Sequence, residues 1–341
     1  MTRDGRRGEA TGDPVDDATL ALLLEVSGTP KPGNVDRRRD LDDLRFEAFL
    51  GGAVGARAGL ELAGETAADA GPADDVPAVG AAFERAVSGM AARAGTNTQF
   101  GCLLLLVPLV RAAADPDRGL SPDGLDAVCR TTTVDDAVAF YRAFEAVDVA
   151  VDDPPSDATD LDVRRGSDAE PALRERGATL RDVLALSADA GDPGDPETTE
   201  DPDRVPDRNA AEWTEGFPRT FRAAEWILTD EGPLADRAAR AFLGLLAAEP
   251  DTLVASTLDA ETAREASGRA RAILEPDAGD PSGPVGNVSG VSADAVHGAD
   301  LDAAESLAAA FVAEGINPGT TADLTCAALF VALRRGAEVA P

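Results

Sequence analysis

Apolar residues recur at helical spacing along most of the chain. Residues three and four apart share one face of an α-helix, so this repeat predicts helices with one buried face. Asp13 fits the N-cap and Pro14 the first helical position of the first one. The segment QFGCLLLLVPLVRAAA (99–114) has few polar residues after Gln99. It predicts a central buried helix that is kinked or ended near Pro108.

The remaining pattern is also helical, and alternating strand patterns are essentially missing. Ser121-Pro122 and Thr133 fit helix starts. Residues 148–176 are polar and irregular. We therefore predict an all-α protein with a single compact domain over 14–338, a disordered tail at 1–13 and an acidic low-complexity insert at 190–207. The other predicted helical segments are 18–28, 42–62, 77–94, 121–130, 134–147, 179–190, 209–230, 233–249, 259–275, 300–315 and 321–336.

Composition adds limits on partners. The chain has 63 acidic and 31 basic residues, a formal charge of −32. Such a surface repels nucleic acid and anionic membranes, so we expect neither as a partner. The acidic residues are spread along the whole chain. This spread favours a solvated acidic surface of the kind halophiles use over a polyanion-like binding function.

The cysteines and the histidine favour no zinc site. Cys102, Cys129 and Cys326 lie in apolar helical contexts without CxxC spacing. They are typical of buried free thiols in a reducing compartment, and we expect a cytoplasmic protein. The longest apolar windows are too short to span a bilayer, and no apolar signal segment follows the N-terminus. The lone His297 is expected to be structural.

One lysine stands out. All other basic residues of the chain are arginines, yet Lys31 lies between two prolines in SGTPKPGNVDRRRD. Lysine has a compact ammonium and arginine a planar fork. A requirement at position 31 that arginine cannot meet is therefore indicated.

Candidate chemistry lies at three polar junctions between apolar helices, since no phosphate-binding loop, GxGxxG or GxSxG motif is present. They are TPKPGNVDRRRD (29–40), AGTNTQFG (94–101) and EGINPGTTADL (314–324). Backbone N–H groups at helix starts bind anions, and carboxylates hold Mg²⁺. Ordinary helix capping is the alternative reading of each junction taken alone.

At these junctions the sequence resembles the ATP:dephospho-CoA triphosphoribosyl transferase family (triphosphoribosyl-dephospho-CoA synthase), as a divergent member of a halophilic, archaeal type. LLLEVSGTPKPGNVDR is similar to its PKPG-(L/N)-VD signature, GTNTQFG to its G-x-NT-H/N-x-G motif and INPGTTADL to its SPGGSADLL-type motif. AEWTEGFP and DTLVAS are weaker matches in the right order. Gln99 and Phe100 stand where the family motif has His and Lys.

The resemblance implies an all-helical transferase. Such an enzyme uses ATP with Mg²⁺ and moves a 5-triphosphoribosyl unit to the ribose 2′-hydroxyl of 3′-dephospho-CoA or a related nucleotide, releasing adenine. For this chemistry we expect Asp36 and Lys31 to be catalytic and Asp36 and Asp323 to hold Mg²⁺. The substrate-binding residues expected are Asn34, Arg37, Arg38, Asn97, Thr98, Gln99, Asn317 and Thr321.

Two other functions stay open at this point. The chain could carry out ATP-dependent phosphoryl or nucleotidyl transfer in cofactor or pterin biosynthesis. It could also be a non-catalytic, nucleotide-binding regulatory protein, which Gln99 and Phe100 motivate. An apolar face on the central helices would allow a homodimer.

Overall fold

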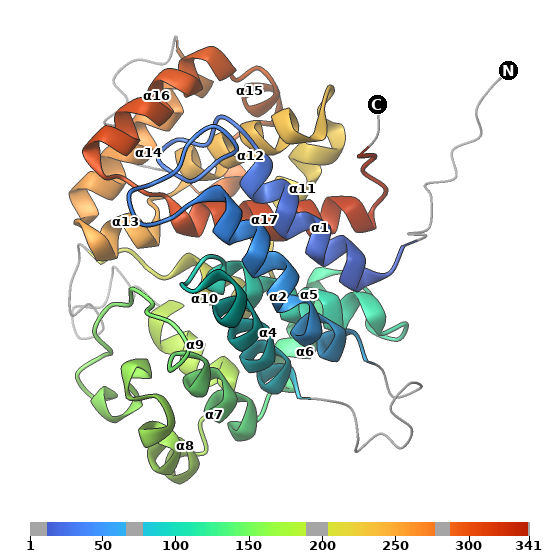
Figure 1. Ribbon diagram of the computed structural model, residues 1–341, viewed down its shortest axis with the longest axis vertical. Helices are drawn as coiled ribbons and strands as arrows, with labels where there is room; N and C mark the ends of the chain where they lie inside the picture. The colour runs from blue at the N-terminus through green and yellow to red at the C-terminus, as the bar shows by residue number, and fades with distance from the viewer. Residues whose placement is uncertain (1–11, 66–77, 189–203, 277–286, 340–341) are drawn as a thin grey trace, which may run out of the picture.

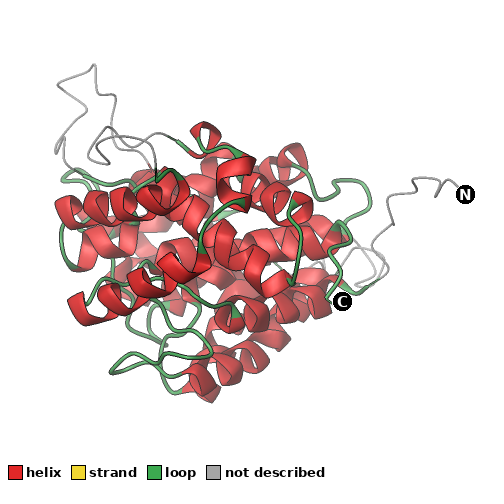
Figure 2. Cartoon of the chain, turned by 90° about the horizontal axis from the view of Figure 1, so that it is seen from above, coloured by secondary structure: helices red, strands yellow, loops and turns green. Residues whose placement is uncertain are grey.

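Helices and their connections make up the described part of the protein. The computed structural model describes residues 12–65, 78–188, 204–276 and 287–339. Within these ranges it has no β-strand, so the all-α prediction is confirmed (Figure 2). Except for their last residues, the tail predicted at 1–13 and the acidic insert predicted at 190–207 lie outside the described residues.

The helices follow the predicted pattern closely. In Figure 1, α17 runs through the middle of the molecule, with α7–α9 below it and α12, α14, α15 and α16 above. Three 3₁₀ segments, η2 (Thr159–Leu161), η3 (Val163–Ala169) and η4 (Val288–Gly290), lie between helices. The α-helices are α1 (Pro14–Ser27), α2 (Phe46–Gly64), α4 (Val79–Ala94), α5 (Phe100–Ala114), α6 (Pro122–Arg130), α7 (Val134–Ala143), α8 (Glu170–Arg176), α9 (Leu180–Ala188), α10 (Arg208–Glu215), α11 (Pro218–Thr229), α12 (Leu234–Ala248), α13 (Thr252–Thr257), α14 (Ala260–Leu274), α15 (Ala293–His297), α16 (Leu301–Glu314) and α17 (Gly319–Arg334).

Local capping chemistry starts several helices where the sequence predicts. Asp13 accepts a hydrogen bond from the Val15 amide (2.9 Å) at the start of α1. Ser121 accepts one from the Gly124 amide (3.1 Å) at the start of α6. Thr133 forms a capping box with Asp136 at the start of α7. Each cap satisfies amides that a helix leaves unpaired at its first turn.

α5 is the central buried helix, as predicted, but it continues through Pro108. A proline inside a helix removes the hydrogen bond to the carbonyl four residues earlier, which here belongs to Leu104. The indole Nε1 of Trp213 in α10 donates to that carbonyl oxygen (3.2 Å). The acceptor freed by Pro108 is thus satisfied from another helix, and α10 is tied to α5.

α2 and α4 pack closely because glycines face each other. A Cβ atom on Gly55 would lie 2.2 Å from the carbonyl oxygen of Gly89, and one on Gly59 would lie 2.2 Å from the amide nitrogen of Ala86. Larger residues at these positions would force the two helices apart.

Three features differ from the sequence expectations. The helical pattern predicted over 209–230 is broken at Gly216 and Phe217, which both have positive φ. The break exists because the buried Glu212 carboxylate accepts from the Arg219 (3.1 Å) and Thr220 (2.9 Å) amides at the start of α11. In addition, α8 and α13 form in segments that carry no clear helical repeat.

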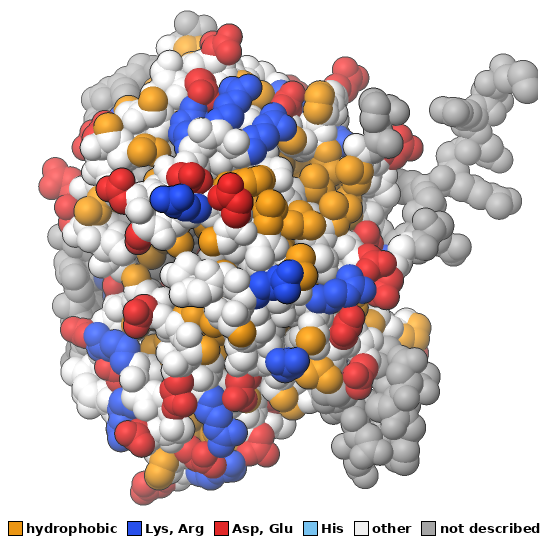
Figure 3. All heavy atoms as spheres, in the orientation of Figure 1, with side chains coloured by type: hydrophobic (Ala, Val, Ile, Leu, Met, Phe, Trp, Pro, Cys, Tyr) orange, Lys and Arg blue, Asp and Glu red, His pale blue; other side chains and the backbone are white. Residues whose placement is uncertain are grey.

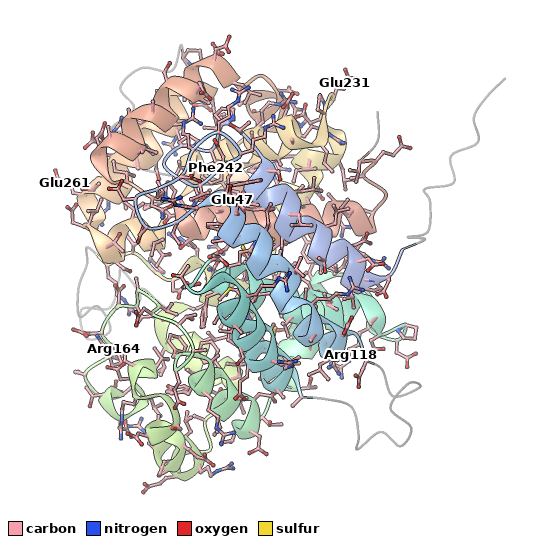
Figure 4. The ribbon with its side chains drawn as sticks, in the orientation of Figure 1. Glu47, Arg118, Arg164, Glu231, Phe242 and Glu261 are labelled. Atoms are coloured by element: carbon pink, nitrogen blue, oxygen red, sulfur yellow. The ribbon has the colours of Figure 1, made fainter. Side chains whose placement is uncertain are left out.

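Charged side chains are spread over the outside. On the face in Figure 3, acidic and basic groups are interspersed, and Figure 4 labels Glu231 and Glu261 at the periphery. No helix in the described ranges has the length and apolar character needed to cross a bilayer.

Candidate active site

A cavity of about 270 Å³ lies where the three polar junctions meet. The end of α1 and the loop after it, the start of α5 and the start of α17 all contribute to its wall. The segment 149–163, the end of α7, α9, the start of α10 and α13 also contribute to it. Of the expected substrate-binding residues, Asn34, Asn97, Thr98 and Asn317 line this cavity, and so does Asp323, which was expected to hold Mg²⁺.

The first and third junctions touch although more than 280 residues separate them. The Asn34 side-chain amide donates to Asn317 Oδ1 (2.9 Å). Gly33 has φ +74°, and a Cβ atom there would lie 1.9 Å from the Ile316 carbonyl oxygen. Only glycine allows this approach without strain.

Lys31 lies behind the cavity wall. Its side chain is 2% exposed, forms an ion pair with Glu25 and donates to Asn34 Oδ1 (3.0 Å). Burial raises the pKa of the Glu25 carboxyl, and the Lys31 charge opposes this shift. Glu25 itself lines the cavity. Lys31 therefore compensates a cavity carboxylate, and it is not among the residues that line the cavity.

Asp36 organises the loop between α1 and α2. It is fully buried and does not line the cavity. Its two oxygens accept hydrogen bonds from the Thr29 hydroxyl (2.8 Å), the Arg38 amide (2.7 Å), the Arg39 guanidinium (2.7 Å) and the Lys31 amide (3.4 Å). With these donors in place, Asp36 fits the role of holding the loop better than a catalytic or Mg²⁺-binding role.

The expected phosphate-binding arginines lie on the surface. Arg37 and Arg38 are exposed and are not among the residues of the cavity wall. Arg38 Nη1 lies 3.8 Å from Glu305 Oε2, and Glu305 also pairs with Arg39. The basic run thus packs beside α16 and does not turn toward the cavity.

The second junction both anchors and lines the site. Gln99 is 1% exposed, and its side-chain amide donates to the Leu22 carbonyl (3.2 Å) in α1. Asn97 accepts from the Phe100 amide (3.2 Å), so it closes the turn into α5. Gln99 therefore positions the junction, while Asn97 and Thr98 face the cavity.

Asp323, in the first turns of α17, is the most unusual acid of the cavity. Its carboxylate accepts from Asn209 Nδ2 (2.8 Å) and Cys102 Sγ (3.1 Å). Burial is the main cause that raises the pKa of Asp323 to about 7, and the nearby Glu25 and Asp251 charges add to it. A carboxyl that titrates near neutral pH and faces a cavity suits proton transfer.

Gly101 makes room for this carboxylate. A Cβ atom at Gly101 would lie 1.9 Å from Asp323 Oδ2. Gly101 of the second junction and Asp323 of the third can therefore pack this closely only because Gly101 has no side chain.

Thr321 faces away from the cavity. Its amide and hydroxyl both donate to Asp251 Oδ2 (2.7 Å each), and Asp251 also caps α13. Thr320, the residue before it, lines the cavity instead and accepts from the Leu253 amide (3.2 Å).

One wall of the cavity is aromatic. The ring centroids of Phe100 and Phe144 lie 4.9 Å apart, and those of Phe140 and Phe144 lie 5.2 Å apart, both edge to face. Flat apolar surfaces of this kind suit a nucleobase or an apolar substituent. Sequence reasoning missed Phe140 and Phe144, because a helical repeat marks them only as core residues.

The polar side of the cavity is mainly acidic. Arg164, labelled in Figure 4, pairs with two of its acids, Asp153 and Asp162 (2.6 Å each). Burial raises the pKa of Asp207, and the charge of Asp152 adds to the shift. Arg204 is the basic residue among the described residues of the wall. The lining carboxylates are Glu25, Asp152, Asp153, Asp162, Asp207 and Asp323.

Comparison with known proteins identifies a family whose model matches this chain. The model of a family described as ATP:dephospho-CoA triphosphoribosyl transferase matches residues 13–192 and 204–340. The chain is also similar to a crystal structure from Archaeoglobus fulgidus, of a protein provisionally assigned as triphosphoribosyl-dephospho-CoA synthase. The two are 20% identical over 84% of this chain and 99% of that one, with a TM-score of 0.56, which shows a shared fold. No curated protein matches the chain.

Proposed function

The chain belongs to the ATP:dephospho-CoA triphosphoribosyl transferase family and is thus a transferase, and we propose that it joins the 5-triphosphoribosyl unit of ATP to the ribose 2′-hydroxyl of 3′-dephospho-CoA. A bond forms between C1′ of the donor and O2′ of the acceptor, and the C1′–N9 bond to adenine breaks. The hydroxyl proton leaves to a base, and adenine departs with the bonding electrons and takes up a proton.

Asp323 is the base in this proposal, and the observation that carries it is its pKa of about 7 at the cavity wall. A base with a pKa near the working pH combines a large ionised fraction with useful basicity. Asn209 and Cys102 donate to its carboxylate and hold it in place.

Glu25 is the second acid with a role in the proposal. Breaking the C1′–N9 bond builds positive charge on the ribosyl centre, which an ionised carboxylate stabilises. Lys31 favours the ionised form of Glu25 against the effect of burial. This assigns Lys31 a positioning role through Glu25.

The acidic side of the cavity is suited to Mg²⁺ that enters bound to the triphosphate of ATP. The described residues contain no group of three or more His, Cys, Asp or Glu side chains placed to hold a metal alone. Mg²⁺ commonly uses one or two carboxylates and the substrate phosphates. Asp207 and Asp152 are like charges that face the cavity, and we assign them this ion in place of Asp36 and Asp323. The bound ion would neutralise the triphosphate, which few basic side chains here can do.

The product of the reaction tests the proposal. The protein is incubated with ATP and Mg²⁺ in molar KCl, with and without dephospho-CoA, and free adenine is measured by chromatography. Adenine that appears only with dephospho-CoA supports the transfer. ADP, AMP or pyrophosphate would indicate phosphoryl or nucleotidyl transfer instead. Bound ATP without any product would indicate a regulatory protein.

Removing Mg²⁺ with EDTA is expected to lower adenine release by at least about 100-fold, because the acidic wall repels the free triphosphate. Asp207→Asn keeps the cap of α10, since asparagine is also a good N-cap, but removes the charge. It should raise the Mg²⁺ concentration for half-maximal activity by roughly 10-fold. An unchanged Mg²⁺ requirement would remove Asp207 from the metal site.

Gly101→Ala is expected to lower kcat/KM by about 10- to 100-fold, because the new methyl group displaces Asp323. Gly51→Ala is the matched control in α2, where a Cβ atom would meet its nearest neighbour at 3.5 Å. Steady-state adenine assays and thermal melts of both variants check this. Similar activity of the two variants would contradict the role of Gly101.

A further inference from the structure

Asn209 is a residue of the cavity wall, and its buried side-chain oxygen has no hydrogen-bond partner among the described residues. The residue is 8% exposed and lines the cavity, and its Oδ1 has no hydrogen-bond partner. Its Nδ2 donates to Asp323 Oδ2 (2.8 Å), which fixes the orientation of the carboxamide. Buried polar atoms are nearly always paired, so an unpaired one at a cavity wall indicates a ligand that donates to it.

The two acceptors are neighbours. Oδ1 and Nδ2 of Asn209 share one carbon, and Nδ2 donates a hydrogen bond to Asp323 Oδ2, so Oδ1 is at most one carboxamide width farther from this carboxylate than Nδ2 is. A carboxylate oxygen and an amide oxygen side by side match two adjacent hydroxyl donors. Nucleotides carry such a pair in the 2′- and 3′-hydroxyls of their ribose.

We propose that Asn209 is a specificity-determining residue that accepts a hydrogen bond from the 3′-hydroxyl of the acceptor nucleotide while Asp323 accepts from its 2′-hydroxyl. The inference rests on the proposed function, in which Asp323 takes the 2′-hydroxyl proton. The substrate class is then a nucleotide with a free ribose 2′,3′-diol.

The same pair rejects a 3′-phosphorylated acceptor. A phosphate at O3′ has no proton to donate at neutral pH, so Asn209 Oδ1 would stay buried and unpaired. Its negative charge would also lie beside Asp323 and close to Glu25, since the charge of Glu25 contributes to the raised pKa of Asp323. The site thus selects against CoA, which differs from dephospho-CoA by that phosphate.

The test compares dephospho-CoA with its 3′-deoxy analogue in wild type and in Asn209→Ala. Wild type is expected to lose about 10- to 100-fold in kcat/KM on the 3′-deoxy acceptor, because the acceptor atom of Asn209 then lacks a partner. Asn209→Ala should be slow with both acceptors and should discriminate less than about 3-fold between them. A 3′-deoxy form of ATP is run in parallel as the donor.

A control variant distinguishes binding of the 3′-hydroxyl of the acceptor from positioning of Asp323. Cys102→Ala removes the other donor to Asp323 but leaves Asn209 in place, so it should keep the wild-type discrimination. Equal activity of wild type with both acceptors would overturn the proposal. Discrimination against 3′-deoxy ATP alone would also overturn it, because the diol would then belong to the donor. If Asn209→Ala does not fold, the wild-type comparison still decides.

If the proposed function is wrong, no adenine will be released with either acceptor, and this result differs from every outcome above. In that case the same acceptors are compared by isothermal titration calorimetry. Binding of dephospho-CoA at least about 10-fold tighter than its 3′-deoxy analogue would still support diol recognition by Asn209. Equal affinities, or no binding of either, would overturn it.

Discussion

Asp323→Asn is expected to lower kcat for adenine release by about 10²- to 10⁴-fold, the range usual for loss of a general base. Asparagine keeps the shape of the side chain and can still accept from Asn209, so the cavity should stay intact. Steady-state adenine assays with ATP and dephospho-CoA measure the loss. A variant with more than about a third of wild-type kcat would remove Asp323 from the base role.

The activity of the wild-type enzyme should rise with pH around neutrality, as expected for a base that acts only when it is ionised. Burial raises the pKa of Asp323 to about 7, and only the ionised form accepts a proton. Hence kcat/KM should rise with pH through this range and level off above it. A profile without an inflection between about pH 6 and 8 would contradict the assignment.

The same substitution should make the fold more stable at alkaline pH. A carboxyl whose pKa is raised in the folded state costs stability as pH rises from the ordinary aspartate range, about 4, through its folded pKa near 7. Asparagine cannot ionise, so the melting temperature of Asp323→Asn should exceed that of wild type at pH 8 and approach it at pH 4. A gain in stability with a loss of activity excludes misfolding as the cause.

Lys31→Met is expected to lower the free energy of unfolding by about 3 to 5 kcal/mol at pH 8, because it leaves the buried Glu25 charge without its partner. Without Lys31 the pKa of Glu25 rises further. A smaller fraction of Glu25 is then ionised at pH 5 than at pH 8, so the loss of stability should be smaller at pH 5. Urea unfolding at both pH values measures the difference.

The double variant Glu25→Gln/Lys31→Met is the matched control. It removes both charges and should recover much of the stability, since no unpaired charge remains buried. It should not recover adenine release if an ionised Glu25 stabilises the ribosyl centre. Equal stability of Lys31→Met and wild type would show that the ion pair does not contribute as proposed.

The acidic composition of the chain does not account for Lys31. On the face in Figure 3, charges of both signs are scattered among hydrophobic and other groups, and such exposed charges contribute little individually. Lys31 instead lies in the interior, where its ammonium contacts Glu25 and Asn34 at once. A branched guanidinium would need more space and more acceptors than this site offers. The single lysine is therefore accounted for by its buried surroundings.

By itself, the sequence determined the features that depend on near neighbours. Helical periodicity located most helices, and the caps at Asp13, Ser121 and Thr133 marked where α1, α6 and α7 begin. Local motifs also pointed to the family, which the family model confirms. These signals are readable because helix formation and capping involve residues within about four positions of each other.

Only the tertiary structure decided which side chains of each junction face the cavity. Asp36 and Thr321 belong to the right junctions, yet their hydrogen bonds turn them inward, whereas Asp323 meets Gly101 and Asn209 across more than 100 residues of chain. The sequence likewise did not reveal that Lys31 pairs with Glu25, or that Trp213 donates to the carbonyl oxygen freed by Pro108. The physical reason is that burial, charge pairing and close approach depend on contacts between distant segments, which no local pattern encodes.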